Sequence, residues 1–130
     1  MAASTKPTIV LVCGAWHVPE HYQHLTSRLE KAGYTVHAIQ LAATADQPTD
    51  VDASPSVAVL RTTIEQCADR GEDVMLVVHS AGGVAAGDGT KGLIKTDREK
   101  AGKKGGVGRM CYICAFAPAE GQSLYGATNG

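Results

Sequence analysis

The sequence predicts an α/β fold, a three-layer sandwich in which helices cover both faces of a mostly parallel sheet. Two observations lead to this prediction. Short apolar runs rich in β-branched residues recur along the chain, as expected for strands buried on both faces of a parallel sheet. Between them lie segments whose apolar residues recur at three- and four-residue steps, so strand and helix alternate. A length of 130 residues fits one domain.

The first half of the chain begins with a strand and a helix. Thr8–Val12 is a continuous apolar run that ends near a glycine, which predicts a buried strand. Proline suits the first turn of a helix, so a helix is expected from Pro19 until Gly33 ends it, with a sheet-facing stripe of Tyr22, Leu25, Leu29 and Ala32. Residues 34–41 are expected to form a second strand, followed by a polar surface loop.

The second half begins with a longer helix. Ser54 is its expected N-cap and Gly71 lies just past its end, with an apolar stripe formed by Val57, Leu60, Ile64 and Cys67. Residues 74–78 are expected to form a third strand, and residues 81–86 the start of a closely packed helix. A polar loop at residues 95–108 and a fourth strand at residues 107–116 are expected to follow.

Composition and charge exclude several classes of protein. The chain is 44% hydrophobic and 19% charged, and its net charge of −1 is too balanced to favour nucleic acid or an anionic membrane as a partner. The basic residues between Lys91 and Arg109 are interrupted by acidic ones and are expected to be solvated. The polar start and the short apolar runs predict a cytoplasmic protein with neither signal peptide nor membrane span. The oligomeric state stays open.

The four cysteines are expected to be free thiols. Cys111 and Cys114 have the spacing of a redox or metal-binding pair, but they lie in a strand-like run and not at the head of a helix, where a thiolate would be stabilised. Residues three apart on a strand point to opposite faces, which disfavours a disulfide between them. No metal site is expected.

The most informative segment is Val74–Gly83, a buried strand that runs into a turn of small residues and then a helix. This is the pattern of a nucleophile elbow, in which a serine lies on a strained turn and its hydroxyl projects above the strand ends. Ser80 is therefore the candidate nucleophile. Gly82 and Gly83 are the small neighbours downstream, whereas Val78 stands where a small residue is usual upstream.

The end of the first strand is expected to complete this site. If the first and third strands are neighbours, their carboxyl ends meet at one edge of the sheet, where ligands bind. Acyl transfer needs two backbone N–H donors facing the developing oxyanion, one after the nucleophile and one from this first loop. Ala81 and Ala15 are the candidate donors. The same loop is expected to bind substrate through Gly14, Trp16 and His17.

With these motifs the sequence resembles the α/β-hydrolase superfamily, in particular small esterases of the AB hydrolase-1 type with an H-G-A-W loop and an H-S-x-G-G elbow. Further similar segments, some of them typical of a fungal-type branch, are Pro19–Tyr34, Lys91-Gly-Leu, Lys103-Lys-Gly-Gly and Tyr112-Ile-Cys-Ala-Phe-Ala-Pro. The resemblance implies hydrolysis of a small carboxylic ester or related acyl substrate without a cofactor, by a triad in the chain order serine, acid, histidine. Cys13 departs from the pattern, because the family usually has a histidine there.

The histidines limit this prediction. All five precede Ser80, and they are His17, His21, His24, His37 and His79. Without a base, a serine is a weak nucleophile at neutral pH. Residues 1–130 are therefore expected to be the N-terminal part of one α/β-hydrolase domain whose cap, acid and histidine are missing, and to be inactive in this truncated form. His17 lies on the loop after the first strand and could reach the site as a substitute base, although a solvated or substrate-lining role is favoured. His79 is expected to point away from Ser80, and His21 and His24 are expected to be exposed on a helix.

Two alternative functions stay open. One is a non-catalytic hydrolase-like binding domain, which the missing base favours. The other is a Rossmann-like nucleotide-binding module, because Gly87-Asp-Gly-Thr-Lys-Gly92 matches G-x-G-x-x-G, although it does not directly follow a strand as that fingerprint requires. For an enzyme, esterase, lactonase, amidase and hydroxynitrile lyase chemistry all stay open, and the sequence does not name the substrate.

Overall fold

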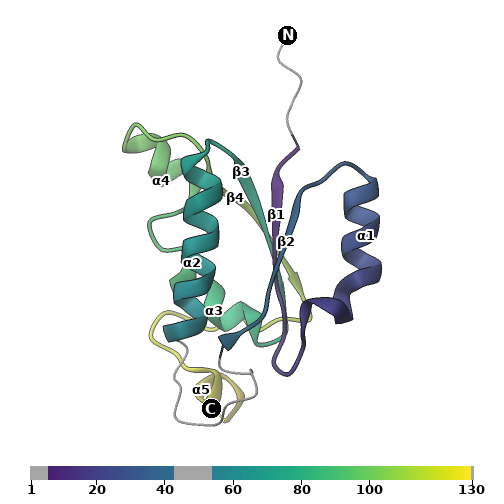
Figure 1. Ribbon diagram of the computed structural model, residues 1–130. Coiled ribbons are helices and arrows are strands. Elements are labelled where there is room, and N and C mark those ends of the chain that lie inside the picture. Colours follow the sequence, from purple (N-terminus) through teal and green to yellow (C-terminus); the bar gives the residue numbers. More distant parts are fainter. Residues whose placement is uncertain (1–5, 43–53, 130) are drawn as a thin grey trace.

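The computed structural model describes residues 6–42 and 54–129 (Figure 1). Within these residues, four strands form one sheet in the order β2-β1-β3-β4, and every neighbouring pair is parallel. The strands are β1 (Thr8–Val12), β2 (Val36–Ile39), β3 (Asp73–His79) and β4 (Gly106–Ile113). The predicted parallel sheet is confirmed, and β1 and β3 are neighbours.

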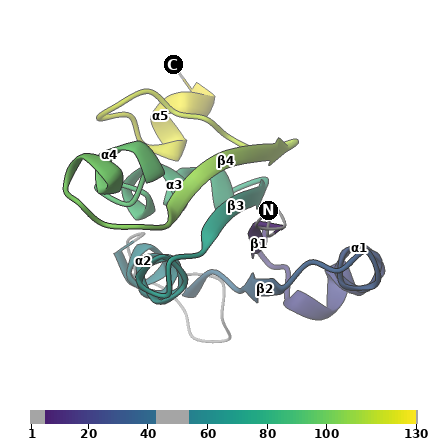
Figure 2. The same cartoon turned by 90° about the horizontal axis from the view of Figure 1, so that it is seen from above.

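Helices cover both faces of this sheet. A 3-10 helix η1 (Pro19–Tyr22) leads into α1 (Gln23–Lys31), and together they lie on one face. The opposite face is covered by α2 (Ser54–Asp69) and α3 (Gly82–Gly89), as Figure 2 shows. Two short helices complete the described chain, α4 (Lys95–Lys100) and α5 (Leu124–Asn129). The predicted three-layer α/β sandwich is therefore confirmed.

The core divides into two layers because side chains alternate along each strand. In β1, Val10 and Val12 pack toward α2 and α3, whereas Ile9 and Leu11 pack toward α1. Every residue of β1 is buried. Burial on both faces is the reason that this strand is a continuous apolar run with no polar alternation.

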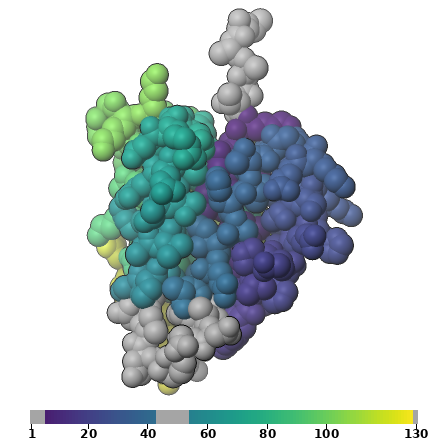
Figure 3. All heavy atoms as spheres, viewed as in Figure 1, coloured from purple at the N-terminus to yellow at the C-terminus, as the bar shows by residue number. Residues whose placement is uncertain are grey.

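The longest helix packs as its apolar stripe predicts. Leu60, Ile64 and Cys67 of α2 are buried against the sheet and α3. A Cβ added to Gly89 of α3 would lie 2.6 Å from a methyl group of Leu60, so the two helices approach closely only because α3 is made of small residues. Figure 3 shows the outer face of α2 beside the surface formed by β2 and α1.

Some expected boundaries differ from the structure. The first helix opens as a 3-10 turn, and its stripe includes Tyr22, Leu25 and Leu29 but not Ala32, which is exposed just past the last turn. The second and fourth strands are shorter than expected. The predicted loop after the second strand falls on residues 43–53, outside the described residues.

The expected loop at residues 95–108 is wrong over part of its length. Residues 95–100 form α4, which the pattern missed because six mostly charged residues carry no apolar stripe. The helix is held by Arg98, whose side chain is 6% exposed and whose guanidinium donates to the Asp69 carboxylate and to the carbonyls of Lys104 and Gly105. A side chain from inside the predicted loop thus organises the loop itself.

The chain carries no segment in its described part that would pass through a bilayer as a helix, since none is both long and apolar enough.

Candidate active site

Ser80 lies at the tip of the turn between β3 and α3, as the sequence predicts. Its backbone has a φ of 51°, in the left-handed region that residues other than glycine rarely adopt. Such a conformation costs on the order of 1–3 kcal/mol and persists only where the surroundings enforce it. Here the Ser80 carbonyl accepts the N–H groups of Gly83 and Phe116, at 3.2 and 3.1 Å.

The small residues after Ser80 are required by close packing. A Cβ at Gly82 would lie 2.9 Å from the carbonyl oxygen of Val12, and a Cβ at Gly83 would overlap the carbonyl of Phe116. The turn therefore fits between the ends of β1 and β4 only with glycine at both positions. Val78, which replaces the usual upstream small residue, is fully buried in β3.

The loop after β1 touches the turn directly. A Cβ at Gly14 would lie 3.1 Å from the Cβ of Ser80 and 2.8 Å from Nδ1 of His79. The loop continues as a tight turn in which the His17 amide donates to the Gly14 carbonyl at 3.1 Å. Trp16, within this turn, has a φ of 58° and is 85% exposed. The structure thus brings together the two segments that the sequence assigned to one site.

The candidate oxyanion donors have free amides in the described structure. Neither the Ala15 N–H nor the Ala81 N–H bonds to an acceptor within residues 6–42 and 54–129. The Ala15 carbonyl is engaged, because Nδ1 of His17 donates to it at 2.7 Å. A carbonyl only accepts, so this bond places the His17 proton on Nδ1 and leaves a lone pair on Nε2 of the neutral ring.

Aromatic and imidazole rings surround this loop. The His17 ring packs edge-on against those of His79 and His21, with centroids 5.1 and 5.4 Å apart. The Tyr22 hydroxyl accepts the Gly14 N–H at 2.9 Å and lies 2.6 Å from Nδ1 of His79. Burial raises the pKa of the Tyr22 phenol above its ordinary value, and the Gly14 N–H opposes that shift. The phenol therefore stays protonated at neutral pH.

Sequence reasoning missed Tyr22 and His79 as members of the site. Tyr22 fits the apolar stripe of the first helix, and nothing in that periodicity shows that its hydroxyl reaches the loop after β1. His79 was expected to point away from Ser80. Its ring lies beside Gly14 and the Tyr22 hydroxyl, and it therefore contacts the loop after β1. His21 and His24 are exposed, as expected, while His37 lies on β2.

Comparison with known proteins identifies the family of the chain. The sequence pattern of the alpha/beta hydrolase family matches residues 9–128. The chain belongs to the alpha/beta hydrolase family.

Two curated relatives and one solved structure show the extent of the similarity. The chain is 37% identical over 121 residues to the alpha/beta hydrolase nvfD of Aspergillus novofumigatus, covering 93% of this chain and 48% of that protein. It is 30% identical over 129 residues to the probable hydrolase R7 of a Phoma species, covering 97% and 49%. The chain thus spans about half the length of the curated relatives it matches.

The solved structure is an extracellular alpha/beta-hydrolase from a Paenibacillus species. It superposes with a TM-score of 0.66 and 27% identity, over 91% of this chain and 44% of that one. That protein is described as sharing structural and functional homology with tobacco salicylic acid binding protein 2.

The cysteines of the described structure carry neither a disulfide nor an activated thiolate. All four are free, as predicted. Burial raises the pKa of the Cys13 thiol to about 11, so the side chain that replaces the family's usual histidine is a neutral thiol at pH 7. Cys111 lies in β4 and Cys114 just past it. Within the described part of the chain, no cluster of potential metal ligands is present.

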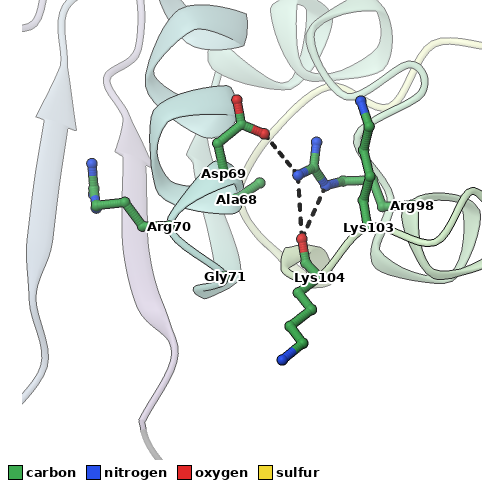
Figure 4. A pocket seen from close by; sticks show the side chains of 7 residues that line it. All are labelled: Ala68, Asp69, Arg70, Gly71, Arg98, Lys103 and Lys104. Atoms are coloured by element: carbon green, nitrogen blue, oxygen red, sulfur yellow. Dashed lines mark hydrogen bonds and ion pairs between the residues drawn. The ribbon is translucent and has the colours of Figure 1, made fainter.

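A basic cavity of about 390 Å³ lies far from Ser80, at the end of α2 that precedes β3 (Figure 4). Asp69 and Arg98 face each other across it at 2.9 Å, while the Lys103 and Lys104 side chains extend away (Figure 4). Because α2 leads into the start of β3, this cavity is at the amino end of the strands. It therefore cannot serve chemistry at Ser80, which is at their carboxyl end.

Proposed function

We propose that this chain carries the nucleophile and oxyanion hole of a serine hydrolase that acts on a small carboxylic ester or a related acyl substrate. The observation that supports this most strongly is the left-handed Ser80 on the turn from β3 to α3, in contact with the loop after β1. Strain of this kind at a half-buried polar residue is expected where a hydroxyl must project from the backbone.

The proposed electrostatic machinery is a pair of backbone amides. The N–H groups of Ala81 and Ala15 stabilise the oxyanion that forms when Ser80 attacks an acyl carbon. Both belong to segments that pack against each other, and both lack a competing acceptor among the described residues. Preorganised donors need no rearrangement during the reaction, which is the basis of their effect on rate.

The proposed substrate contacts come from the same loop, through Gly14, Trp16 and His17. Gly14 packs directly against the nucleophile, because a Cβ there would lie 3.1 Å from the Cβ of Ser80. The Trp16 indole is exposed next to the proposed donor Ala15 and offers an apolar surface to an acyl or alcohol group. The Paenibacillus neighbour's homology to a salicylic acid binding protein makes aromatic esters the first substrates to test.

The 130 residues alone are proposed to turn over esters very slowly. All five histidines precede Ser80, so no base stands in the family's usual chain order. Oxyanion donors alone leave an acceleration on the order of 10³–10⁴ over water. The Nε2 lone pair of His17 makes it the upstream histidine best prepared to accept a proton.

The test is an assay of the purified chain after circular dichroism has confirmed folding. Hydrolysis of p-nitrophenyl acetate and acylation of Ser80, detected by mass spectrometry, are compared with Ser80→Ala and His17→Gln variants. We expect slow acylation that requires Ser80 and negligible turnover. Acylation that is equal in Ser80→Ala would overturn the assignment of the nucleophile, and fast turnover lost in His17→Gln would overturn the expectation of inactivity.

The second candidate function is a non-catalytic binding domain, favoured by the homology of the Paenibacillus neighbour to a salicylic acid binding protein. Salicylate binding that is unaffected in Ser80→Ala, together with no acylation of Ser80 by activated esters, would support this function instead. A nucleotide-binding module is less well supported, because Gly87 and Gly89 lie in the second half of α3 and not between a strand and a helix.

A further inference from the structure

We propose that Tyr22 is a positioning residue, whose hydroxyl holds the two proposed oxyanion donors in register with each other. This inference rests on the function proposed for Ser80, and it assigns a role to a side chain outside that machinery. Tyr22 acts through the residues it bonds, Gly14 and His79.

One oxygen atom links both donor segments. The Tyr22 hydroxyl accepts the Gly14 N–H at 2.9 Å, and Gly14 directly precedes the proposed donor Ala15. The same oxygen lies 2.6 Å from Nδ1 of His79, which is followed by Ser80 and the proposed donor Ala81. A shift of either segment would lengthen one of these two bonds.

The proposal also specifies which atom donates in the bond between Tyr22 and His79. In the proposed arrangement the Tyr22 hydroxyl accepts the Gly14 N–H and donates its own proton to Nδ1 of His79. Neutral His79 then carries its proton on Nε2. Burial keeps the phenol in its protonated form, which this arrangement requires.

The bond to Gly14 also determines which amide of the loop stays free. Gly14 is buried, and a buried N–H without an acceptor costs on the order of 1–3 kcal/mol. Tyr22 satisfies that group, while the turn is closed by the His17 amide on the Gly14 carbonyl. Because the Gly14 N–H already has an acceptor, the loop keeps a conformation in which the Ala15 amide is free to bind an oxyanion.

Tyr22 is itself well anchored. It lies where η1 passes into α1, and its ring packs against the core layer between the sheet and α1. The ring also contacts those of His79 and His17, with centroids 5.7 and 5.9 Å apart. A phenol fixed by its ring is a suitable reference point for a loop without regular secondary structure.

The test compares Tyr22→Phe with Tyr34→Phe in the full 130-residue chain labelled with ¹⁵N. Each variant loses one hydroxyl from a ring that packs against the same core layer. Tyr34 is the matched control, since its ring contacts Lys6 and its hydroxyl makes no hydrogen bond within residues 6–42 and 54–129. Amide hydrogen exchange reports on Gly14, and the imidazole nitrogen shifts report the protonated atom of His79.

In Tyr22→Phe we expect exchange at Gly14 to accelerate about tenfold or more, because its N–H loses its acceptor. We also expect shifts of the Ala15 and Ala81 amides and loss of the single His79 tautomer, while Tyr34→Phe leaves all three unchanged. The chemical readout is acylation of Ser80: its maximal rate should fall about tenfold, with an unchanged half-saturating ester concentration.

Unchanged Gly14 exchange and Ala81 shift in folded Tyr22→Phe would overturn the proposal. If that variant does not fold, the imidazole nitrogen shifts of the unsubstituted chain still test the proposal. A neutral His79 protonated on Nδ1 would contradict the proposed bond from the Tyr22 hydroxyl. The NMR readouts require no activity. A failure of Ser80 to be acylated in the unsubstituted chain would therefore count against the proposed function, while the exchange data would judge Tyr22 separately.

Discussion

Gly14 and Ser80 touch across the carboxyl ends of β1 and β3, because a Cβ at Gly14 would lie 3.1 Å from the Cβ of Ser80. The same Cβ would lie 2.8 Å from Nδ1 of His79. The close packing at this site therefore requires glycine at position 14. The Ser80 Cβ and the His79 ring cannot move aside as the end of a long flexible side chain would. This contact gives the first prediction.

Gly14→Ala is expected to destabilise the chain by about 1–3 kcal/mol, the usual cost of forcing an extra methyl group into a packed position. It should also displace the His79 ring. Urea unfolding measures the first effect, and the His79 ring shifts measure the second. Gly108→Ala is the control, since its added Cβ would meet only ordinary contact at 3.7 Å. Equal stability of the two variants would contradict the packing argument.

A second prediction concerns Arg98, a buried side chain whose guanidinium binds Asp69 and two loop carbonyls. Arg98→Ala is expected to lower the free energy of unfolding by about 2 kcal/mol, because it leaves acceptors unsatisfied and removes a packed stem. It should also increase hydrogen exchange in α4. Arg109→Ala, at an exposed position of β4, should stay within about 0.5 kcal/mol of the unsubstituted chain. A similar loss in both variants would show that charge, and not this bonding pattern, is responsible.

The sequence predicts the sheet and the elbow because both depend on local rules. β1 and β3 are continuous apolar runs since both of their faces are buried, and this pattern is visible without a structure. The turn at Ser80 is recognisable because Gly82 and Gly83 must pass close to other backbone segments. In each case one segment of the chain carries the whole physical requirement.

What the sequence does not predict depends on contacts between distant segments. α4 is stabilised by Arg98 reaching Asp69 on α2, and its own residues have no helical stripe. Tyr22 and His79 are 57 positions apart, and their contact exists only because β1 lies beside β3. Hydrophobic periodicity assigns Tyr22 to the core and contains no information about its hydroxyl.

A third prediction follows from the buried Cys13 thiol, whose pKa burial raises from 9.0 to about 11. A raised pKa stabilises the fold below the unfolded value, and this contribution is lost as the pH rises through the folded one. The stability of the unsubstituted chain relative to Cys13→Ala should therefore be constant up to about pH 9 and fall by roughly 2 kcal/mol toward pH 11.

The measurement is urea unfolding of both chains across this pH range. Thiol alkylation gives an independent check, since exposed Cys114 should react in the folded chain and Cys13 only on unfolding. A stability difference that does not change with pH, or rapid alkylation of Cys13 at pH 8 in the folded chain, would contradict the assigned burial.

The last prediction tests the strain at Ser80 itself. Its φ of 51° penalises any residue with a Cβ by about 1–2 kcal/mol, whereas glycine adopts this region freely. Glycine also loses more entropy on folding, so Ser80→Gly is expected to be more stable than Ser80→Ala by a net amount of about 0.5–1 kcal/mol. Ser27, inside α1, provides the matched pair, because in a helix interior the order reverses and Ser27→Gly should be less stable than Ser27→Ala by about 1 kcal/mol. Urea unfolding of the four variants gives both differences under the same conditions. The same order at both positions would show that the backbone at Ser80 is not strained, and the main support for a projecting nucleophile would be lost.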